Sequence, residues 1–204
     1  MKNTGSLGVM LIIYFAGIFT GIGISAWKLN ATGVAVLQPG KAQESDAKNE
    51  IMTRISGLER MLGATPQNLQ ALIQLGNDYF DIGNYEKSIE IYEKALKIDP
   101  QNAEVTTDMG VAYRRLGKTD ESVKFFRKAL EIDPNQGLAM FNLGMVLRDD
   151  KKDLPAALQV WKTFLEKTPD SPHAVMIRPW VKQLEEKLNS KDTNNSSGDA
   201  SQKQ

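Results

Sequence analysis

The chain has 204 residues, of which 41% are hydrophobic, so it is long enough to form one or two domains with a buried core. It carries 25 Lys and Arg residues against 25 Asp and Glu residues, and this zero net charge, without a dense basic run, argues against nucleic acid as a partner. The absence of cysteine excludes disulfides, thiolate metal sites and a cysteine nucleophile, and the sequence predicts no cofactor and no metal.

Residues 7–27 form an apolar run of 21 positions without a charged side chain, and we expect a membrane anchor within residues 1–28. As a helix this run reaches about 30 Å, the thickness of a bilayer's hydrocarbon core. A cleaved signal peptide is the alternative, but the run is longer than the usual signal core and no clear cleavage site follows it. Gly17, Gly21 and Ser25 are spaced four apart on one helix face, where small residues allow close packing, so a homodimer through the anchor is a further expectation. The flanking lysines do not decide the orientation of the span.

Two polar segments are predicted to lack a core of their own. Residues 29–48 are small and polar and contain Pro39-Gly40, which favours a flexible linker. Residues 190–204 are rich in Ser, Asn, Lys and Asp, a composition typical of a disordered tail. The segment between them, 49–189, is therefore the predicted folded domain.

An internal repeat dominates this domain. A large apolar residue followed by glycine returns at a spacing of 34 residues, at Leu75-Gly76, Met109-Gly110 and Leu143-Gly144. Residues of the same kind then follow in the same order: Tyr79, Tyr113 and Leu147; Ser88, Ser122 and Ala157; Tyr92, Phe126 and Trp161; Ala95, Ala129 and Phe164; and Asp99-Pro100, Asp133-Pro134 and Thr168-Pro169.

Each repeat unit contains two amphipathic stretches, because apolar residues recur at spacings of three and four. Gly83 and Gly117 lie between the stretches and are predicted to end the first helix in a left-handed conformation. Asn84 and Thr119 follow and are predicted to cap the second helix, as is Asp153 in the third unit. Small residues such as Gly76 should let the paired helices cross closely, with the aromatic residue of the second helix filling the space beside them.

The period and the residue order resemble the tetratricopeptide-repeat family. The resemblance implies an all-α fold, an antiparallel helix-pair solenoid that would follow the N-terminal transmembrane helix. Its three full repeats would span about 69–102, 103–136 and 137–171. The apolar positions of residues 50–62 indicate a further helix ahead of the repeats, and 173–188 reads as a capping helix that Pro179 would kink or split. About eight helices are expected in this domain.

In this family the first helix of each pair lines a concave groove that binds an extended peptide or a partner's helix. The register implied by the resemblance assigns five groove residues to each unit: Gln70, Ile73, Asn77, Phe80 and Asp81; Glu104, Thr107, Val111, Arg114 and Arg115; and Leu138, Phe141, Met145, Arg148 and Asp149. Its apolar members are expected to form an exposed stripe, and the arginines to grip a carboxylate. Thr107 and Val111 depart from the carboxylate clamp of chaperone-binding repeats, so an acidic heat-shock-protein tail is not the expected ligand.

The sequence predicts that the protein is not an enzyme. His173 is the only histidine and follows Pro172 at the start of a predicted helix, where it reads as a surface residue rather than a base. We find no glycine-rich phosphate loop, metal-ligand spacing or nucleophile motif.

The predicted function is an adaptor that binds a protein or peptide partner in the groove. An anchor, a linker and three repeats are similar in arrangement to bacterial proteins of cytochrome c maturation and nitrite reductase assembly. That similarity implies assembly of a membrane-associated or periplasmic complex, and a single-pass location in the bacterial inner membrane with the repeats in the periplasm. A homo-oligomeric scaffold on the membrane and a regulatory tether on the cytoplasmic side remain as alternatives.

Overall fold

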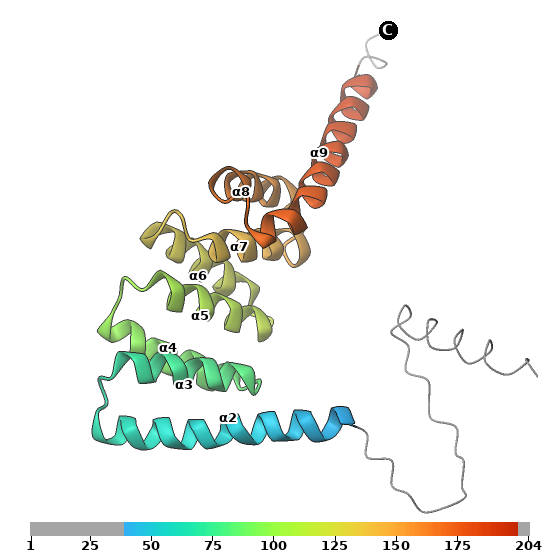
Figure 1. The fold of residues 1–204 in the computed structure, drawn as a ribbon. Helices are drawn as coiled ribbons and strands as arrows, with labels where there is room; N and C mark the ends of the chain where they lie inside the picture. Colours follow the sequence, from blue (N-terminus) through green and yellow to red (C-terminus); the bar gives the residue numbers. More distant parts are fainter. Residues whose placement is uncertain (1–38, 200–204) are drawn as a thin grey trace, which may run out of the picture. The chain divides into compact units, whose positions relative to one another are not determined.

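The computed structural model describes residues 39–199, and within this range it contains eight α-helices and no strand. In chain order the helices are α2 (Pro39–Ala64), α3 (Leu69–Asp81), α4 (Tyr85–Ile98), α5 (Ala103–Arg115), α6 (Thr119–Ile132), α7 (Gly137–Asp149), α8 (Leu154–Lys167) and α9 (Pro172–Asp199). Three antiparallel pairs, α3 with α4, α5 with α6 and α7 with α8, stack in successive layers between α2 and α9 (Figure 1). The predicted all-α helix-pair solenoid is confirmed.

The glycine of each first helix receives the aromatic ring of its partner helix. A Cβ atom added at Gly76 would lie 2.4 Å from the Tyr92 ring, and one added at Gly110 would lie 2.6 Å from the Phe126 ring. The same holds for Gly144 and the Trp161 indole, at 2.1 Å. Helix pairs therefore cross at a distance that only a residue without a side chain permits.

The turns between paired helices show how the sequence ends one helix and begins the next. Gly83 and Gly117 adopt φ values of 79° and 72°, as the sequence predicts. Asn84 caps α4, and Asp153 caps α8 with a 3.1 Å bond from the Ala156 amide. The prediction that Thr119 caps α6 is wrong, because Lys118 occupies the cap position without a side-chain bond and Thr119 is the first helical residue.

The third pair contains Phe164 where the first two pairs have alanine, and the chain compensates with a smaller residue opposite. Phe164 is buried, and its ring lies 3.4 Å from the position a Cβ would take on Gly137. The corresponding residue in the second pair is Ala103, 34 positions earlier. In the turn before α8, Lys152 takes the left-handed conformation with φ of 58°, which glycine provides in the other two turns.

The first flanking helix, α2, packs onto the first pair through Ile55, which is buried, and through an ion pair. Asp78 of α3 is fully buried, and the Arg54 guanidinium donates hydrogen bonds of 2.6–3.0 Å to both of its carboxylate oxygens. The Gln74 amide donates a further hydrogen bond of 2.9 Å to the same carboxylate. This buried carboxylate is thus fully paired, as burial of a charge requires.

The second flanking helix, α9, covers the end of the stack on α8. Its residues Ala174, Ile177, Val181 and Leu184 are buried against the last pair. Pro179 lies inside the helix, which it does not divide. The two flanking helices thus shield the apolar faces that the end pairs of a solenoid would otherwise expose.

Two predicted boundaries differ from the helices observed. The helix α2 begins at Pro39, within the predicted linker 29–48, because proline is well accommodated in the first turn of a helix. The helix α9 continues to Asp199, into the predicted tail 190–204. The division of the chain into an anchor, linker, repeat domain and tail stays a prediction.

The predicted inner-membrane location is contradicted. None of the helices within residues 39–199 combines the length and the apolar character needed to cross a bilayer. The two long ones, α2 with 26 residues and α9 with 28, carry charged side chains along their length. The predicted span 7–27, with Gly17, Gly21 and Ser25, lies outside the described residues, and the location is withdrawn.

Candidate functional site

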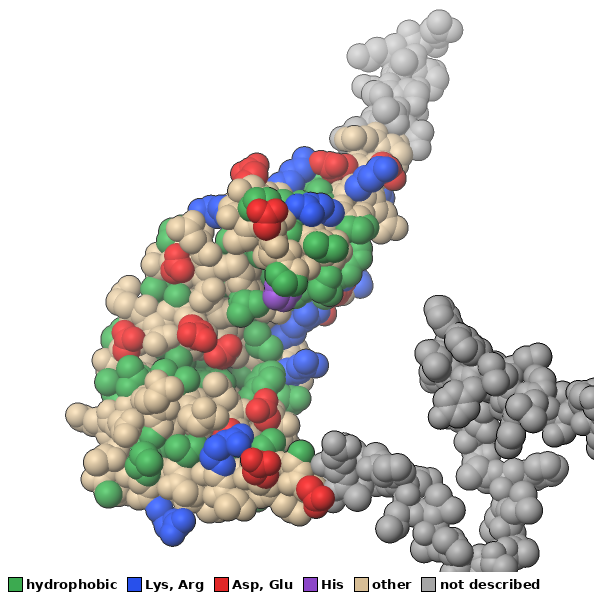
Figure 2. Space-filling view, in the orientation of Figure 1, with side chains coloured by type: hydrophobic (Ala, Val, Ile, Leu, Met, Phe, Trp, Pro, Cys, Tyr) green, Lys and Arg blue, Asp and Glu red, His purple; other side chains and the backbone are tan. Residues whose placement is uncertain are grey.

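The helices α3, α5 and α7 form one wall of the stack, which we call the groove wall. Their side chains surround two cavities, one between α3 and α5 and one between α5 and α7. Figure 2 shows hydrophobic side chains at the surface of the stack, with acidic and basic side chains interspersed among them.

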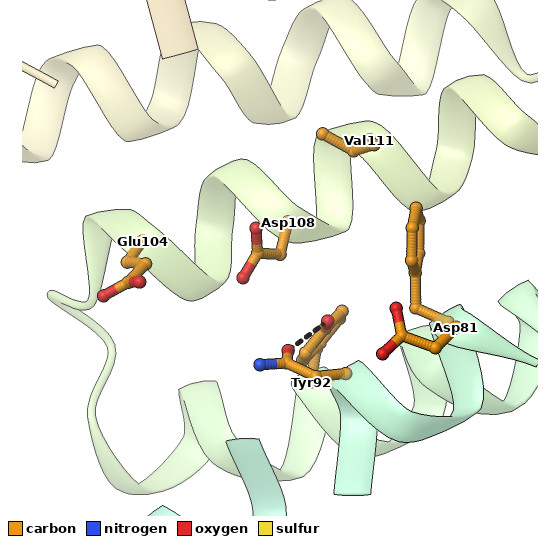
Figure 3. A pocket seen from close by; sticks show the side chains of 7 residues that line it. Asp81, Tyr92, Glu104, Asp108 and Val111 are labelled. Carbon is orange, nitrogen blue, oxygen red and sulfur yellow. Dashed lines mark hydrogen bonds between the residues drawn. The ribbon is translucent and has the colours of Figure 1, made fainter. Parts of the chain in front are cut away.

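The first cavity has a volume of about 340 Å³. It is lined by Asn77, Phe80, Asp81, Tyr92, Glu104, Asp108 and Val111. Three of these side chains are carboxylates, one from α3 and two from α5, and none is a lysine or arginine. Figure 3 shows Asp108 projecting from α5 toward Tyr92, with Glu104 one helical turn earlier and Asp81 on the facing helix.

The floor of the first cavity is held in place by a side-chain hydrogen bond. The Tyr92 hydroxyl donates to the Asn77 Oδ1 atom at 2.6 Å (Figure 3), and the Tyr92 ring rests on Gly76. Burial raises the pKa of Tyr92, so the hydroxyl stays protonated and remains a donor.

Asp108 is the carboxylate that the fold perturbs most within the cavity. Burial, and to a lesser extent the neighbouring charge of Glu104, raise its pKa to about 6 from an ordinary value of 3.8. Both causes disfavour the charged form of Asp108. No ion pair relieves them within residues 39–199.

The second cavity, of about 460 Å³, is lined by Val111, Arg114, Arg115, Gly117, Thr119, Asn142 and Asp150. Its arginines differ in their surroundings. The Arg114 guanidinium lies 2.7 Å from the Asp150 carboxylate and 3.6 Å from that of Asp149, whereas Arg115 is exposed. A ligand carboxylate would therefore find Arg114 already neutralised.

Arg148 of α7, predicted to face the groove, is held by three neighbours instead. Its guanidinium bonds to both oxygens of Asp149, and its Cζ atom lies 4.2 Å from the Trp180 ring and 5.0 Å from the Trp161 ring. This placement satisfies the charge and stacks it on aromatic faces. The Asp149 pKa is lowered, chiefly by its hydrogen bond from Arg148.

The predicted apolar stripe is present on the groove wall, but its members are half-buried rather than freely exposed. Ile73 and Phe80 pack against the core of the first pair, and Val111 and Met145 against that of the later pairs. Phe141 contacts the imidazole of His173 in α9, with ring centroids 4.5 Å apart.

Seven of the predicted groove residues line the cavities: Asn77, Phe80, Asp81, Glu104, Val111, Arg114 and Arg115. Val111 is common to both cavities. In contrast, Thr107 is buried, and its hydroxyl bonds to the backbone oxygen of Ala103, so it offers nothing to a ligand.

Six residues that line the cavities were not among the predicted groove residues: Tyr92, Asp108, Gly117, Thr119, Asn142 and Asp150. Asp108 and Asn142 are 34 positions apart and occupy the same place in successive repeats. The signal was available, because Asp108 lies four residues after Glu104 and three before Val111, on one helix face. Tyr92 belongs to a second helix, and only the helix crossing places its hydroxyl at the cavity.

The carboxylates of the groove wall do not form a metal centre. Within residues 39–199 there is no group of three or more His, Cys, Asp or Glu residues suited to hold a metal ion. The arrangement is instead that of a binding surface, with apolar contacts at Phe80 and Val111 and with hydrogen-bonding groups at fixed positions.

Comparison with known proteins bears on the fold of the chain. Residues 67–135 match the tetratricopeptide repeat family model. Two crystal structures of MamA align with TM-scores of 0.57 and 0.58 at 20% identity, covering 74% and 76% of this chain and 95% and 90% of those chains. The first tetratricopeptide-repeat domain of Spaghetti (RPAP3), solved bound to the HSP90 peptide SRMEEVD, aligns with a TM-score of 0.54 at 24% identity, covering 60% of this chain and 94% of that one.

No curated protein matches the sequence. The structural likenesses are all below 25% identity, so they bear on the fold alone, which is a helical repeat stack like the one described above. The family match covers the first two helix pairs, and the spacing of 34 residues extends the same pattern through the third. Residues 67–135 of the chain thus match the tetratricopeptide-repeat family, and the helix pair α7 with α8 continues the same arrangement.

Proposed function

We propose that this protein is an interaction adaptor that binds an extended peptide or a helix of a partner protein along its groove wall. The observation that carries the proposal is the position of Val111, whose side chain lines both cavities and so makes them neighbouring subsites of one surface. A partner segment crossing α5 would contact both. The tetratricopeptide-repeat domain of RPAP3, solved with a bound HSP90 peptide, shows that a related fold accommodates such a segment.

The proposed function covers partner binding alone and omits the other roles expected from the sequence. Membrane anchoring, a homodimer through the anchor and a role in cytochrome c maturation gain no support from residues 39–199 or from the comparisons, and they are not part of it. The proposal also includes no catalytic step. The homo-oligomeric scaffold is retained only as an outcome of the test.

The test is selection of a random peptide library displayed on phage against the full chain, followed by affinity measurement with the selected peptides. Val111→Glu places a charge between the two cavities and should weaken binding by about tenfold or more, since a buried unpaired charge costs more than 1.4 kcal/mol. Val175→Glu is the matched control, because Val175 is 65% exposed and lines neither cavity.

Failure to select any peptide would contradict the adaptor proposal, as would equal affinity of both variants and the unsubstituted chain. Self-association of the full chain that Val111→Glu disrupts would instead favour the scaffold. Circular dichroism of both variants establishes that the helices are intact.

A further inference from the structure

We infer that the first cavity receives a basic side chain, lysine or arginine, of the partner segment. The inference rests on the proposed function and adds to it the chemistry of one subsite. Three properties of the cavity support it: its charge, its size and its walls.

The charged side chains that line the first cavity are all acidic. Asp81, Glu104 and Asp108 line it, and none of the three forms an ion pair within the described part of the chain. Arg54 is within electrostatic reach of Asp81, but its guanidinium is bonded to Asp78. A bound cation would therefore be the counterion that the cavity lacks.

Other carboxylates in the interior or on the groove wall form ion pairs with arginine side chains. Asp78 is paired with Arg54, and Asp149 and Asp150 are paired with Arg114 and Arg148. The first cavity thus brings together one half-buried carboxylate, Asp108, and two exposed ones, Asp81 and Glu104, and no ion pair within residues 39–199 includes any of them. Unpaired carboxylates favour a basic partner segment over an acidic one, because opposite charges attract across an interface and like charges repel.

The size and the walls of the cavity fit one long side chain. A volume of about 340 Å³ is at the lower end of the range for ligand pockets. Phe80 and Val111 supply apolar contact for the aliphatic stem of a lysine or arginine, and the carboxylates lie beside it for the charged end. Charge-assisted hydrogen bonds to Asp108 and Glu104 would then complete the contact.

Two other occupants fit less well. A metal ion would need a converging set of ligands, and the described residues contain none. An acidic segment such as the SRMEEVD peptide bound by the RPAP3 domain would place its carboxylates beside three others. Both the burial of Asp108 and the nearby Glu104 oppose added negative charge here.

The experiment uses the peptides selected on the full chain. Each is synthesised in three forms that differ at one position, with lysine, with the uncharged isostere norleucine or with glutamate. The lysine form should bind about tenfold more tightly than the norleucine form, and the glutamate form should be weaker still, because a hydrogen bond to a charged group contributes roughly that factor.

Asp108→Asn should remove most of the lysine preference, whereas Glu131→Gln, at an exposed carboxylate of α6 that lines neither cavity, should leave it unchanged. The lysine preference should also fall as salt is raised. Thermal unfolding of both variants verifies that they fold.

The outcomes separate the inference from the proposed function. Peptides that bind the groove wall, and lose affinity with Val111→Glu, but show no basic preference or keep it in Asp108→Asn, overturn the inference and leave the adaptor function standing. Peptides that bind without any dependence on Val111 overturn the proposed function as well. If Asp108→Asn abolishes the preference for a basic residue and Glu131→Gln does not, the result supports both the inference and the proposed function.

Discussion

Asp108 is a carboxylate whose charge the folded chain opposes. Its burial in α5 and the proximity of Glu104 raise its pKa to about 6, and none of the described ion pairs includes it. Residues kept in an energetically unfavourable state are frequent at binding sites, where the partner supplies what the fold leaves out. The same residue therefore links the stability of the protein to the chemistry of its proposed ligand.

Asp108→Asn should stabilise the protein at neutral pH. Because the folded-state pKa is raised from 3.8 to about 6, the folded chain holds this proton more tightly than the unfolded chain, and stability is lost as pH rises through 6. The variant has no carboxyl group at this position, so its stability does not fall in this way as pH rises. Chemical denaturation should show a gain of about 1–3 kcal/mol at pH 7.5 that shrinks toward pH 4.

Glu131→Gln is the control for this measurement, since Glu131 is exposed on α6. A difference between Asp108→Asn and the unsubstituted chain that stays constant from pH 4 to pH 7.5 would show that Asp108 is not perturbed in the folded state.

At the scale of the helix pair, the contact between glycine and an aromatic ring determines how closely two helices pack. Gly110 of α5 lies against Phe126 of α6, and the equivalent contacts occur at Gly76 and Gly144. Because the groove wall is built from α3, α5 and α7, this packing also sets the positions of the side chains that line the two cavities.

Gly110→Ala should destabilise the protein by about 1–3 kcal/mol, because its Cβ would lie 2.6 Å from the Phe126 ring and the ring is fully buried. Gly57→Ala in α2 is the matched control. Nothing lies within 4 Å of the added Cβ there, so this change should stabilise the helix by about 0.5–1 kcal/mol. Urea unfolding measures both, and an equal response of the two variants would contradict the packing described.

The helix pairs could be predicted from the sequence because each depends on local patterns. The spacing of Gly76, Gly110 and Gly144 places the close contacts, and Asn84 and Asp153 lie where helix caps are expected. These features repeat in register, so each supports the others. Thr119 failed as a cap because the chain enters α6 one residue earlier than the residue type suggested.

The site was harder to predict, because it depends on which way each helix faces. Thr107 and Asp108 are adjacent, yet the first is buried and the second lines a cavity. Arg54 and Asp78 are 24 residues apart and meet only because α2 packs on α3. Arg148 has the residue type expected of a ligand-binding group, but its guanidinium already bonds to Asp149 and stacks on two tryptophan rings, those of Trp161 and Trp180.

At the scale of the whole stack, the groove wall presents two unlike subsites joined at Val111. The first cavity carries unpaired carboxylates, whereas the second contains Arg115, which is exposed, and Arg114, which Asp150 neutralises. A partner segment that places a basic side chain in the first cavity and a less charged portion over the second would match both. This arrangement would give the segment a direction across α5, from the first cavity to the second.

The most direct test of the groove wall as the binding surface is photo-crosslinking of a selected peptide that carries benzoylphenylalanine, with the linked residues located by mass spectrometry. Crosslinks should fall on α3, α5 and α7, at or beside Phe80, Val111 and Asn142, and an excess of the unlabelled peptide should suppress them. Crosslinks confined to the opposite surface, around Leu130, Pro134 and Val160 of the pocket between α6 and α8, would contradict the account.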